Sequence, residues 1–234
     1  MLDRQLSGLK RSRLLSNLSD EQVSIVSDRC RWQQCDKGQQ IISQEDPSTD
    51  VFFVVEGEVR AKSYSLSGRE VSFNDIADGD IFGEFSAIDG QDRASSVFAL
   101  KKCLLARMSA SDFRRTLTEM PEASIKLIEI LVEKTRILSD RVFEFSTLPV
   151  QGRVIVELLR LADKGQENER EGIVVINPAP THYEMATRIS THREAVTREL
   201  NHLVDEEIIT VQRRRIDVLD MSRLRELAED ALHG

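Results

Sequence analysis

The sequence predicts an α+β fold in which a β jelly roll, a long helix and a small helical domain follow one another. Three observations support this prediction. Glycines punctuate short β-rich runs between Asp36 and Met108, a heptad pattern follows Pro121, and two capped helical segments lie near the C-terminus. The predicted domains are residues 1–120, residues 121–148 with a hinge at their end, and residues 149–234.

The composition is that of an ordinary globular protein. Of the 234 residues, 40% are hydrophobic and 31% are charged, and no window holds the ~20 apolar residues that span a bilayer. The N-terminus lacks the apolar core and cleavage site of a signal peptide, so we expect a cytoplasmic protein that does not associate with membranes. The net charge of -8 means that any contact with nucleic acid has to come from a locally basic face.

In the first domain, short β-rich runs such as DVFFVVEGEVRAKSYS alternate with glycines. Evenly spaced short strands with glycine turns are typical of a small sandwich or jelly roll. The segment SLSGRE, residues 65–70, has the composition of a hairpin loop. The glycines that separate the runs are Gly38, Gly57, Gly68, Gly79, Gly83 and Gly90.

The segment after Pro121 carries apolar residues in alternating steps of three and four, which is typical of a coiled-coil seam. A long helix with this seam can dimerise, or the same stripe can pack against the chain's own β-domain; periodicity does not separate the two. Because Pro149 cannot continue the helix, we expect its end and a hinge near Thr147 and Leu148. The seam residues are Ile128, Leu131, Thr135, Leu138, Val142 and Phe145.

The last domain begins with VQGRVIVELLRLAD, which predicts a helix, followed by a polar loop, KGQENEREG, and a short strand, IVVINPAP. Thr181 and Glu184 form a capping-box pattern at the start of one helix, and Thr191 and Glu194 repeat it ten residues later. Two short helices joined by a tight turn are a helix-turn-helix candidate. The segment IITVQRRRIDVLD predicts a β-hairpin wing. The predicted inward-facing residues of the two helices are Met185, Ala186, Ile189, Val196, Leu200 and Leu203.

The second helix of this pair carries residues suited to a DNA major groove. Arginine offers two donors to guanine and glutamate can accept from cytosine, while arginines on the wing and polar groups at the helix N-terminus suit phosphates. The alternative is that Glu194 only caps the helix and that the arginines are solvated. The predicted DNA-binding residues are Thr191, His192, Arg193, Glu194, Thr197, Arg198 and Arg214, with Arg213 and Arg215 beside the last.

The stretch FGEFSAIDGQDRASSV, residues 82–97, places Glu84 nine positions before Arg93 among small residues. Gly83 permits close backbone approach, Glu84 can accept from a sugar hydroxyl, and Arg93 can pair with a phosphate beside the hydroxyls of Ser95 and Ser96. Sugar and phosphate together describe a nucleotide. A salt bridge between Glu84 and Arg93 is the alternative.

This stretch resembles the phosphate-binding cassette of cyclic-nucleotide-binding domains. With ISTHREAVTREL near the C-terminus, the chain resembles the Crp-Fnr family of bacterial transcription regulators from about Leu18 to Leu227. The resemblance implies a homodimer joined along the long helix, each subunit having a jelly-roll sensor and a winged-helix reader of palindromic DNA. It also implies contact with RNA polymerase.

The resemblance assigns the ribose hydroxyl to Glu84 and the cyclic phosphate to Arg93. Two residues depart from the family pattern: Leu138 stands where a threonine is usual, and Ala94 stands where the best-known member has serine, which removes one phosphate hydroxyl unless Ser95 or Ser96 substitutes. Because cyclic-GMP-dependent kinases typically have threonine after the arginine, Ala94 favours cyclic AMP over cyclic GMP as the allosteric effector. The implied effector-binding residues are Gly83, Glu84, Phe85, Arg93, Ala94, Ser95 and Ser139.

Three further interpretations are weighed against this one. Some relatives sense through an iron–sulfur cluster or haem. The three cysteines, Cys30, Cys35 and Cys103, are too few and too dispersed for a cluster and are expected to be reduced thiols. The sensor region has no histidine to bind haem, so no metal, haem or cluster is expected. A nucleotide-responsive module whose C-terminal helices bind protein is a second alternative. An enzyme is not expected, because Glu84 and Arg93 form no acid/base pair.

Overall fold

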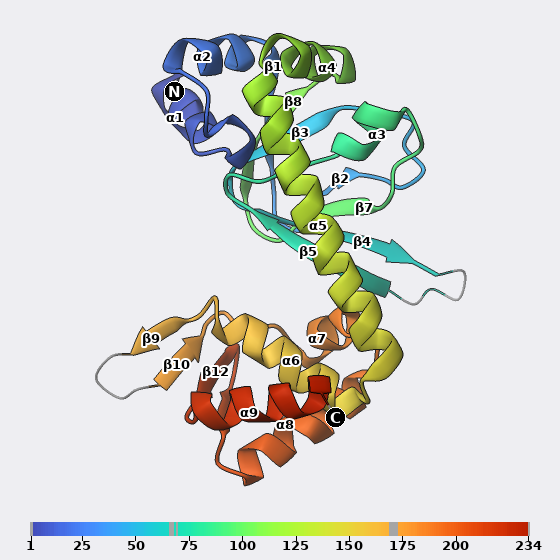
Figure 1. Ribbon diagram of the computed structural model, residues 1–234, viewed down its shortest axis with the longest axis vertical. Helices are drawn as coiled ribbons and strands as arrows, with labels where there is room; N and C mark the ends of the chain where they lie inside the picture. The colour runs from blue at the N-terminus through green and yellow to red at the C-terminus, as the bar shows by residue number, and fades with distance from the viewer. Residues whose placement is uncertain (1, 66–67, 69, 169–172, 234) are drawn as a thin grey trace. The chain divides into compact units, whose positions relative to one another are not determined.

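The computed structural model describes residues 2–65, 68, 70–168 and 173–233 (Figure 1). The chain divides into two compact units, residues 1–135 and 136–234, and each is described by itself. The domain boundaries expected after residues 120 and 148 stay predictions.

The first unit contains a jelly roll of two four-stranded antiparallel sheets, which confirms the predicted fold class. In the predicted hairpin, Tyr64 pairs with Glu70, while residues 66, 67 and 69 lie outside the described residues. One sheet is ordered β1 (Cys30–Cys35), β8 (Cys103–Met108), β3 (Val51–Glu56), β6 (Ile81–Phe82). The other is ordered β2 (Gln40–Ile42), β7 (Ser96–Ala99), β4 (Glu58–Tyr64), β5 (Glu70–Ala77).

Strand β3 is apolar from Val51 to Val55, before Glu56 at its end, because both of its faces are covered. Phe52 and Val54 point into the space between the sheets, where Phe52 stacks on Phe82 with ring centroids 4.9 Å apart. Val51, Phe53 and Val55 belong to a second core on the outer face of the same sheet. Continuous apolar runs are expected of strands that are buried on both faces.

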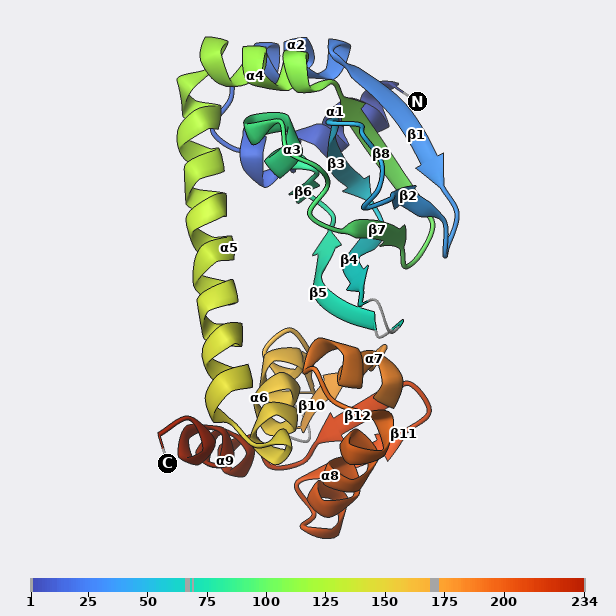
Figure 2. The ribbon, with the colours of Figure 1, turned by 90° about the vertical axis from the view of Figure 1, so that its right-hand side faces the viewer.

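Helices cover this outer face, and Figure 2 shows three of them, α1, α2 and α4, near β1, β3 and β8. The sequence had not predicted the N-terminal ones, although Ser19 and Gln22 form a capping box that opens α2. The covering elements are α1 (Leu2–Lys10), a 3-10 turn (Arg13–Leu15), α2 (Asp20–Asp28), α4 (Ala110–Glu119) and the first turns of α5 (Pro121–Thr147).

Helix α5 ends at Thr147, as the proline at 149 predicts. It carries two separate apolar faces. Ala123, Leu127 and Ile130 are buried in the outer core of the jelly roll. The predicted seam is a different stripe, and apart from the half-buried Leu131 its residues are exposed. Among the seam residues, Leu131 packs against the outer core of the jelly roll, and the pairing of the exposed stripe with a second helix stays a prediction.

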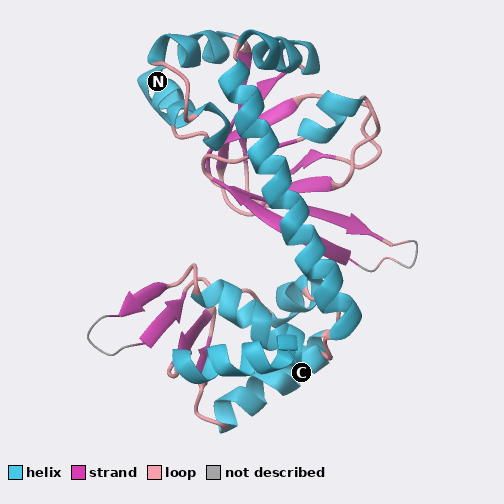
Figure 3. Cartoon of the chain, in the orientation of Figure 1, coloured by secondary structure: helices cyan, strands magenta, loops and turns pink. Residues whose placement is uncertain are grey.

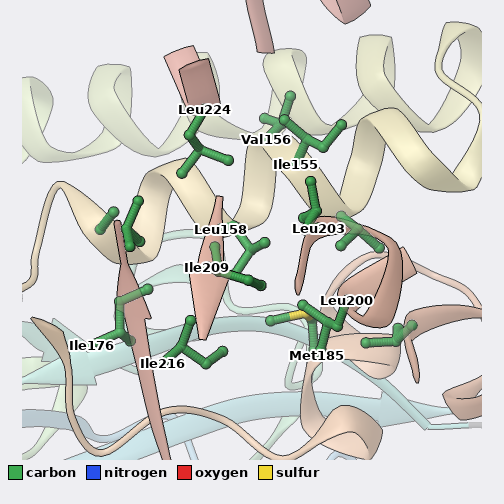
Figure 4. Packing of buried hydrophobic residues seen from close by; sticks show 14 of the residues in the cluster. Ile155, Val156, Leu158, Ile176, Met185, Leu200, Leu203, Ile209, Ile216 and Leu224 are labelled. Atoms are coloured by element: carbon green, nitrogen blue, oxygen red, sulfur yellow. The ribbon is translucent and has the colours of Figure 1, made fainter. Parts of the chain in front are cut away.

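The second unit packs helices against a four-stranded sheet (Figure 3). Its core gathers residues from the helices and from strands β10, β11 and β12, including Leu158, Met185, Leu200, Ile209 and Leu224 (Figure 4). The helices are α6 (Val150–Ala162), α7 (His182–Arg188), α8 (Arg193–Asp205) and α9 (Met221–His233). The sheet is ordered β11 (Ile209–Gln212), β12 (Arg215–Val218), β10 (Ile173–Ile176), β9 (Gln166–Asn168).

Two local predictions in this unit are wrong. The segment expected as a polar loop contains β9, whose backbone pairs with β10 from Asn168 opposite Ile173. The capping box of Thr191 and Glu194 does not form, because α8 begins one residue later, with His192 at the N-cap and no side-chain cap. The capping box of Thr181 and Glu184 is confirmed.

The three cysteines are free thiols. Burial raises the pKa of Cys30 to about 12, and it also raises the pKa of Cys35 and Cys103. Protonated, buried thiols behave as small apolar side chains, so these residues serve packing.

Candidate functional site

The stretch 82–97 folds as a short helix, α3 (Glu84–Asp89), between β6 and β7. Gly83 precedes the helix with a φ of 83°, in the left-handed region. A Cβ at this position would lie 2.6 Å from the backbone oxygen of Asp50 and 2.8 Å from Arg93 Nη1. Glycine is therefore required here for both its conformation and its lack of a side chain.

Arg93 lies beneath this turn and is only 4% exposed. Its Nη1 donates to the backbone oxygen of Gly83 at 3.0 Å, and its Nη2 donates to Ser48 Oγ and to the backbone oxygen of Asp50, both at 3.0 Å. The buried Nε–H has no acceptor among the described residues. Burial lowers the pKa of Arg93, although the nearby carboxylates of Asp46, Asp50 and Glu84 act in the opposite direction.

Glu84, the first residue of α3, is 3% exposed and pairs with Lys134 of α5, with Nζ 2.6 Å from Oε1. In the described part of the chain no hydrogen bond or ion pair joins Glu84 to Arg93, so the predicted alternative of a salt bridge between them is wrong. The sequence analysis missed Lys134, which lies 50 positions away and carries no motif. Lys134 Nζ also lies 5.8 Å from the ring centroid of the exposed Phe85.

The small residues after Arg93 differ in how accessible they are to a ligand. Ala94 is exposed and Ser95 is half-buried. The hydroxyl of the buried Ser96 accepts from the backbone N–H of Gln44 at 3.0 Å. Ser95 is therefore the better placed of the two serines to contact a ligand. Ser139 is an exposed residue of α5 in the second unit, and its expected contact stays a prediction.

These groups suit an anion that carries a hydroxyl. A buried guanidinium whose hydrogen-bond partners are all neutral is stabilised by an anion, and a free N–H is the donor such an anion needs. A buried carboxylate beside it can accept from a hydroxyl. The residues present therefore fit a sugar phosphate.

The second candidate surface is the outer face of α8. Arg193, Glu194 and Arg198 are exposed there, while Val196 and Leu200 are buried on the opposite face. This confirms the predicted division of the helix. Because Glu194 does not cap the helix, its carboxylate is free to meet a partner, and the alternative that it serves only as a cap is wrong.

Other predicted DNA-binding residues surround this helix. Thr191 donates its backbone N–H to Ala186 at 3.0 Å within the turn that joins α7 and α8, and His192 is exposed. Thr197 Oγ1 lies 2.7 Å from His182 Nδ1, a contact that the sequence analysis missed. Ser190 in the turn has a φ of 53°, a left-handed conformation at a position where glycine is common in such turns.

The predicted wing is present as the hairpin of β11 and β12, with Arg213 and Arg214 at its tip between Gln212 and Arg215. Arg214 Nη1 lies 3.1 Å from Glu184 Oε2, and its side chain remains 49% exposed. This exposed ion pair holds the wing tip beside the start of α7 without burying the arginine.

The described residues contain neither a candidate metal site nor a helix that could span a membrane. No group of three or more His, Cys, Asp or Glu side chains could hold a metal ion in the part of the chain that the structure covers. Over the same residues, no helix is long and apolar enough to cross a membrane.

Comparison with protein families matches both candidate surfaces. A cyclic nucleotide-binding domain matches residues 32–120, and a Crp-like helix-turn-helix domain matches residues 152–227. The chain belongs to the Crp-Fnr family. Members of this family are transcription regulators, and the two domains together describe a Crp-like DNA-binding regulator with a cyclic nucleotide-binding domain.

Relatives of known name agree with this assignment. The cyclic AMP receptor protein of Thermus thermophilus is 25% identical over 220 residues, which are 94% of this chain and 98% of that protein. A CooA variant from Carboxydothermus hydrogenoformans has the same fold, with a TM-score of 0.80, 20% identity, and coverage of 93% and 95% of the two chains. The c-di-GMP responsive regulator CLP of Xanthomonas campestris also shares the fold, with a TM-score of 0.77, 14% identity, and coverage of 87% and 100%.

Proposed function

We propose that this Crp-Fnr protein is a homodimeric transcription regulator of the cytoplasm whose binding to a palindromic operator is controlled by a cyclic nucleotide. Cyclic AMP is the favoured effector and cyclic GMP the alternative. The name of the Thermus relative, a cyclic AMP receptor, supports the choice. Ala94, where cyclic-GMP-binding domains of kinases typically have threonine, supports it too.

The observation that carries the proposal is the state of Arg93. A buried cation with neutral partners and an unused N–H calls for an anion, and a cyclic phosphate supplies one negative charge with several acceptor oxygens. Glu84 would accept the ribose 2′-hydroxyl while keeping Lys134 as its counter-ion. Ser95 would donate to the phosphate.

The exposed seam of α5 supports the homodimer. An apolar stripe of this length on a soluble protein is typical of an interaction surface, and heptad spacing suits a second copy of the same helix. A two-fold dimer presents two α8 helices to two half-sites, so the operator is expected to be palindromic, with G·C pairs central to each half-site.

The nucleotide would control DNA binding by shifting the population between two states of the dimer. A nucleotide that contacts the jelly roll and α5 favours one pairing of the two long helices, and this pairing sets the two recognition helices about 34 Å apart, one turn of DNA. The DNA-bound dimer would then contact RNA polymerase to exert its effect on transcription.

The test is calorimetric titration with cyclic AMP and cyclic GMP. We expect micromolar binding of cyclic AMP, weakened about 100-fold or more in Arg93→Ala, because a charge-assisted pair with the phosphate is lost. Arg107→Ala is the matched control, since Arg107 also bonds Asp50 but is 46% exposed and makes no contact with Gly83.

A different effector is the second candidate. Lys134 adds a cation beside Glu84, which suits a more highly charged nucleotide, and the Xanthomonas neighbour is named as responsive to c-di-GMP. Cyclic di-GMP is therefore the third ligand to titrate. Wild-type protein that binds none of the three would refute the effector proposal and leave the DNA-binding proposal standing.

A further inference from the structure

Two side chains of α6 each link α5 to the helix-turn-helix. Arg153 and Glu157 lie one helical turn apart, so they point from the same side of α6. On one side each contacts the last turns of α5, and on the other each contacts the end of α7 or the turn after it. All of these residues belong to the second unit.

Glu157 forms the first link and is 2% exposed. Its Oε2 accepts from Arg141 of α5 at 2.8 Å, and its Oε1 accepts from Arg188, the last residue of α7, at 3.3 Å. Arg160 joins Glu157 to a second buried carboxylate, that of Glu144 on α5. Two carboxylates thus meet three guanidinium groups that come from three helices.

Arg153 forms the second link. Its Nη1 donates to the backbone oxygens of Ile189 and Ser190, at 2.9 and 3.3 Å, in the turn that holds the left-handed serine. Its guanidinium lies 6.0 Å from the ring centroid of Phe145 on α5. The same side chain therefore touches the long helix and fixes the turn that positions the recognition helix.

We infer that Arg153 and Glu157 form a clamp that makes the last turns of α5, from Arg141 onward, one rigid body with the DNA-reading helices. Opening the joint at Thr147–Pro149 would leave buried charges without partners, and it would expose Leu148, which is part of the core. The hinge expected there from the sequence is therefore closed, and bending has to occur N-terminal to Arg141.

The clamp has a consequence that rests on the proposed function. If a nucleotide changes α5, the change reaches α8 through Arg141 and Glu157 rather than through a loose linker. Arg141 is then a positioning residue, which affects DNA binding without touching DNA.

The test combines hydrogen exchange with operator binding in Arg141→Gln. The backbone N–H of Leu148 donates to the backbone oxygen of Glu144 at 2.9 Å, so the exchange rate of this N–H reports on opening of the joint. In Arg141→Gln we expect exchange at Leu148 to be at least about 10-fold faster and operator binding with cyclic AMP present to be about 10-fold weaker. In Arg141→Lys, which keeps the charge, exchange at Leu148 should return to within about 3-fold of the wild-type rate. Arg223→Gln, which breaks an exposed ion pair of the same unit, is the control and should leave both the exchange at Leu148 and the operator affinity unchanged.

The outcomes separate the clamp from the proposed function. Unchanged exchange at Leu148 in a folded Arg141→Gln would overturn the clamp. Faster exchange with operator affinity like that of the wild type would overturn its role in signalling. Wild-type protein that binds no DNA would refute the proposed function, and exchange alone would then decide whether the clamp closes the joint. Nucleotide affinity, measured by calorimetry, should be the same in all variants.

Discussion

At the scale of single residues, the effector site leaves little freedom. Gly83 brings the backbone against Asp50 and Arg93, and Arg93 uses two of its nitrogens to hold that backbone in place. The third nitrogen, Nε, has no acceptor among the described residues, and it is the donor that the proposed function assigns to the ligand. The proposed binding and the observed local structure therefore involve the same guanidinium, so a variant at Arg93 needs a stability measurement beside the titration.

Gly83→Ala is expected to destabilise the sensor by about 3 kcal/mol, from the left-handed backbone together with the collision with Asp50. Gly90→Ala is the matched control. Its φ of 73° is similar, but a Cβ there meets no atom within 4 Å, so only the conformational cost of about 1 kcal/mol remains. Urea unfolding measures both, and equal losses would show that the close approach at Gly83 is unimportant.

Arg198→Ala is expected to reduce discrimination between the preferred operator and random DNA by about 1–3 kcal/mol, because a bidentate contact to a base is lost. Arg198 is exposed and its carboxylate partner is its neighbour Glu199, so removal should not unfold the domain. Arg225→Ala on α9 provides the control, since that arginine is also exposed but lies off the reading helix. Equal loss for both kinds of DNA would assign Arg198 to phosphate contact instead.

At the scale of elements, α5 serves different partners along different faces. Its buried face covers the jelly roll through Ala123, Leu127 and Ile130, while Ile128 and Val142 lie exposed on the other face. Its last turns carry the charges of the clamp. One helix thus carries a buried face, an exposed apolar stripe and the charges of the clamp, and variants can test each separately.

Ile128→Glu is expected to weaken dimerisation at least about 100-fold, because each copy would bury an unpaired carboxylate in the seam. Arg136→Glu changes the charge more but lies off the seam, so it should leave the dimer intact. Sedimentation at several protein concentrations distinguishes them. A dimer that is unaffected by Ile128→Glu would move the interface away from this helix face.

The elements that the sequence predicts are those with a local signal. Heptad spacing and Pro149 predict α5 and its end, and the Thr181 capping box predicts the start of α7. The N-terminal helices were missed because their burial depends on distant residues. Leu9 and its neighbours pack against a sheet whose strands come later in the chain. Lys134 and the clamp were missed for the same physical reason, since their pairing depends on tertiary contacts rather than on spacing.

At the scale of the whole molecule, the apolar cores fall into the two compact units separately. Two clusters belong to the jelly roll and its helices, and one belongs to the DNA-reading unit. Stability is therefore expected to be divided in the same way, with each unit having a transition of its own.

Calorimetric melting is expected to show this division. Cyclic AMP at 100 times its Kd should stabilise the sensor transition by about 2.7 kcal/mol and leave the other nearly unchanged. Leu158→Ala should lower only the DNA-reading transition, by about 2–5 kcal/mol, and Leu105→Ala should lower only the sensor transition by a similar amount, because each leucine is fully buried in one core. A single transition that moves in every case would contradict the division.

The packing of the first 28 residues bears on how the sensor can be isolated. The recognisable nucleotide-binding module begins at Trp32, yet Leu9, Leu14, Val23 and Val26, all at most 2% exposed, complete the outer core of its sheet. A fragment cut at the edge of the family match would uncover that apolar surface and tend to aggregate. The segment that matches the family is thus shorter than the segment that completes this core, and a soluble sensor fragment has to start at the N-terminal helix.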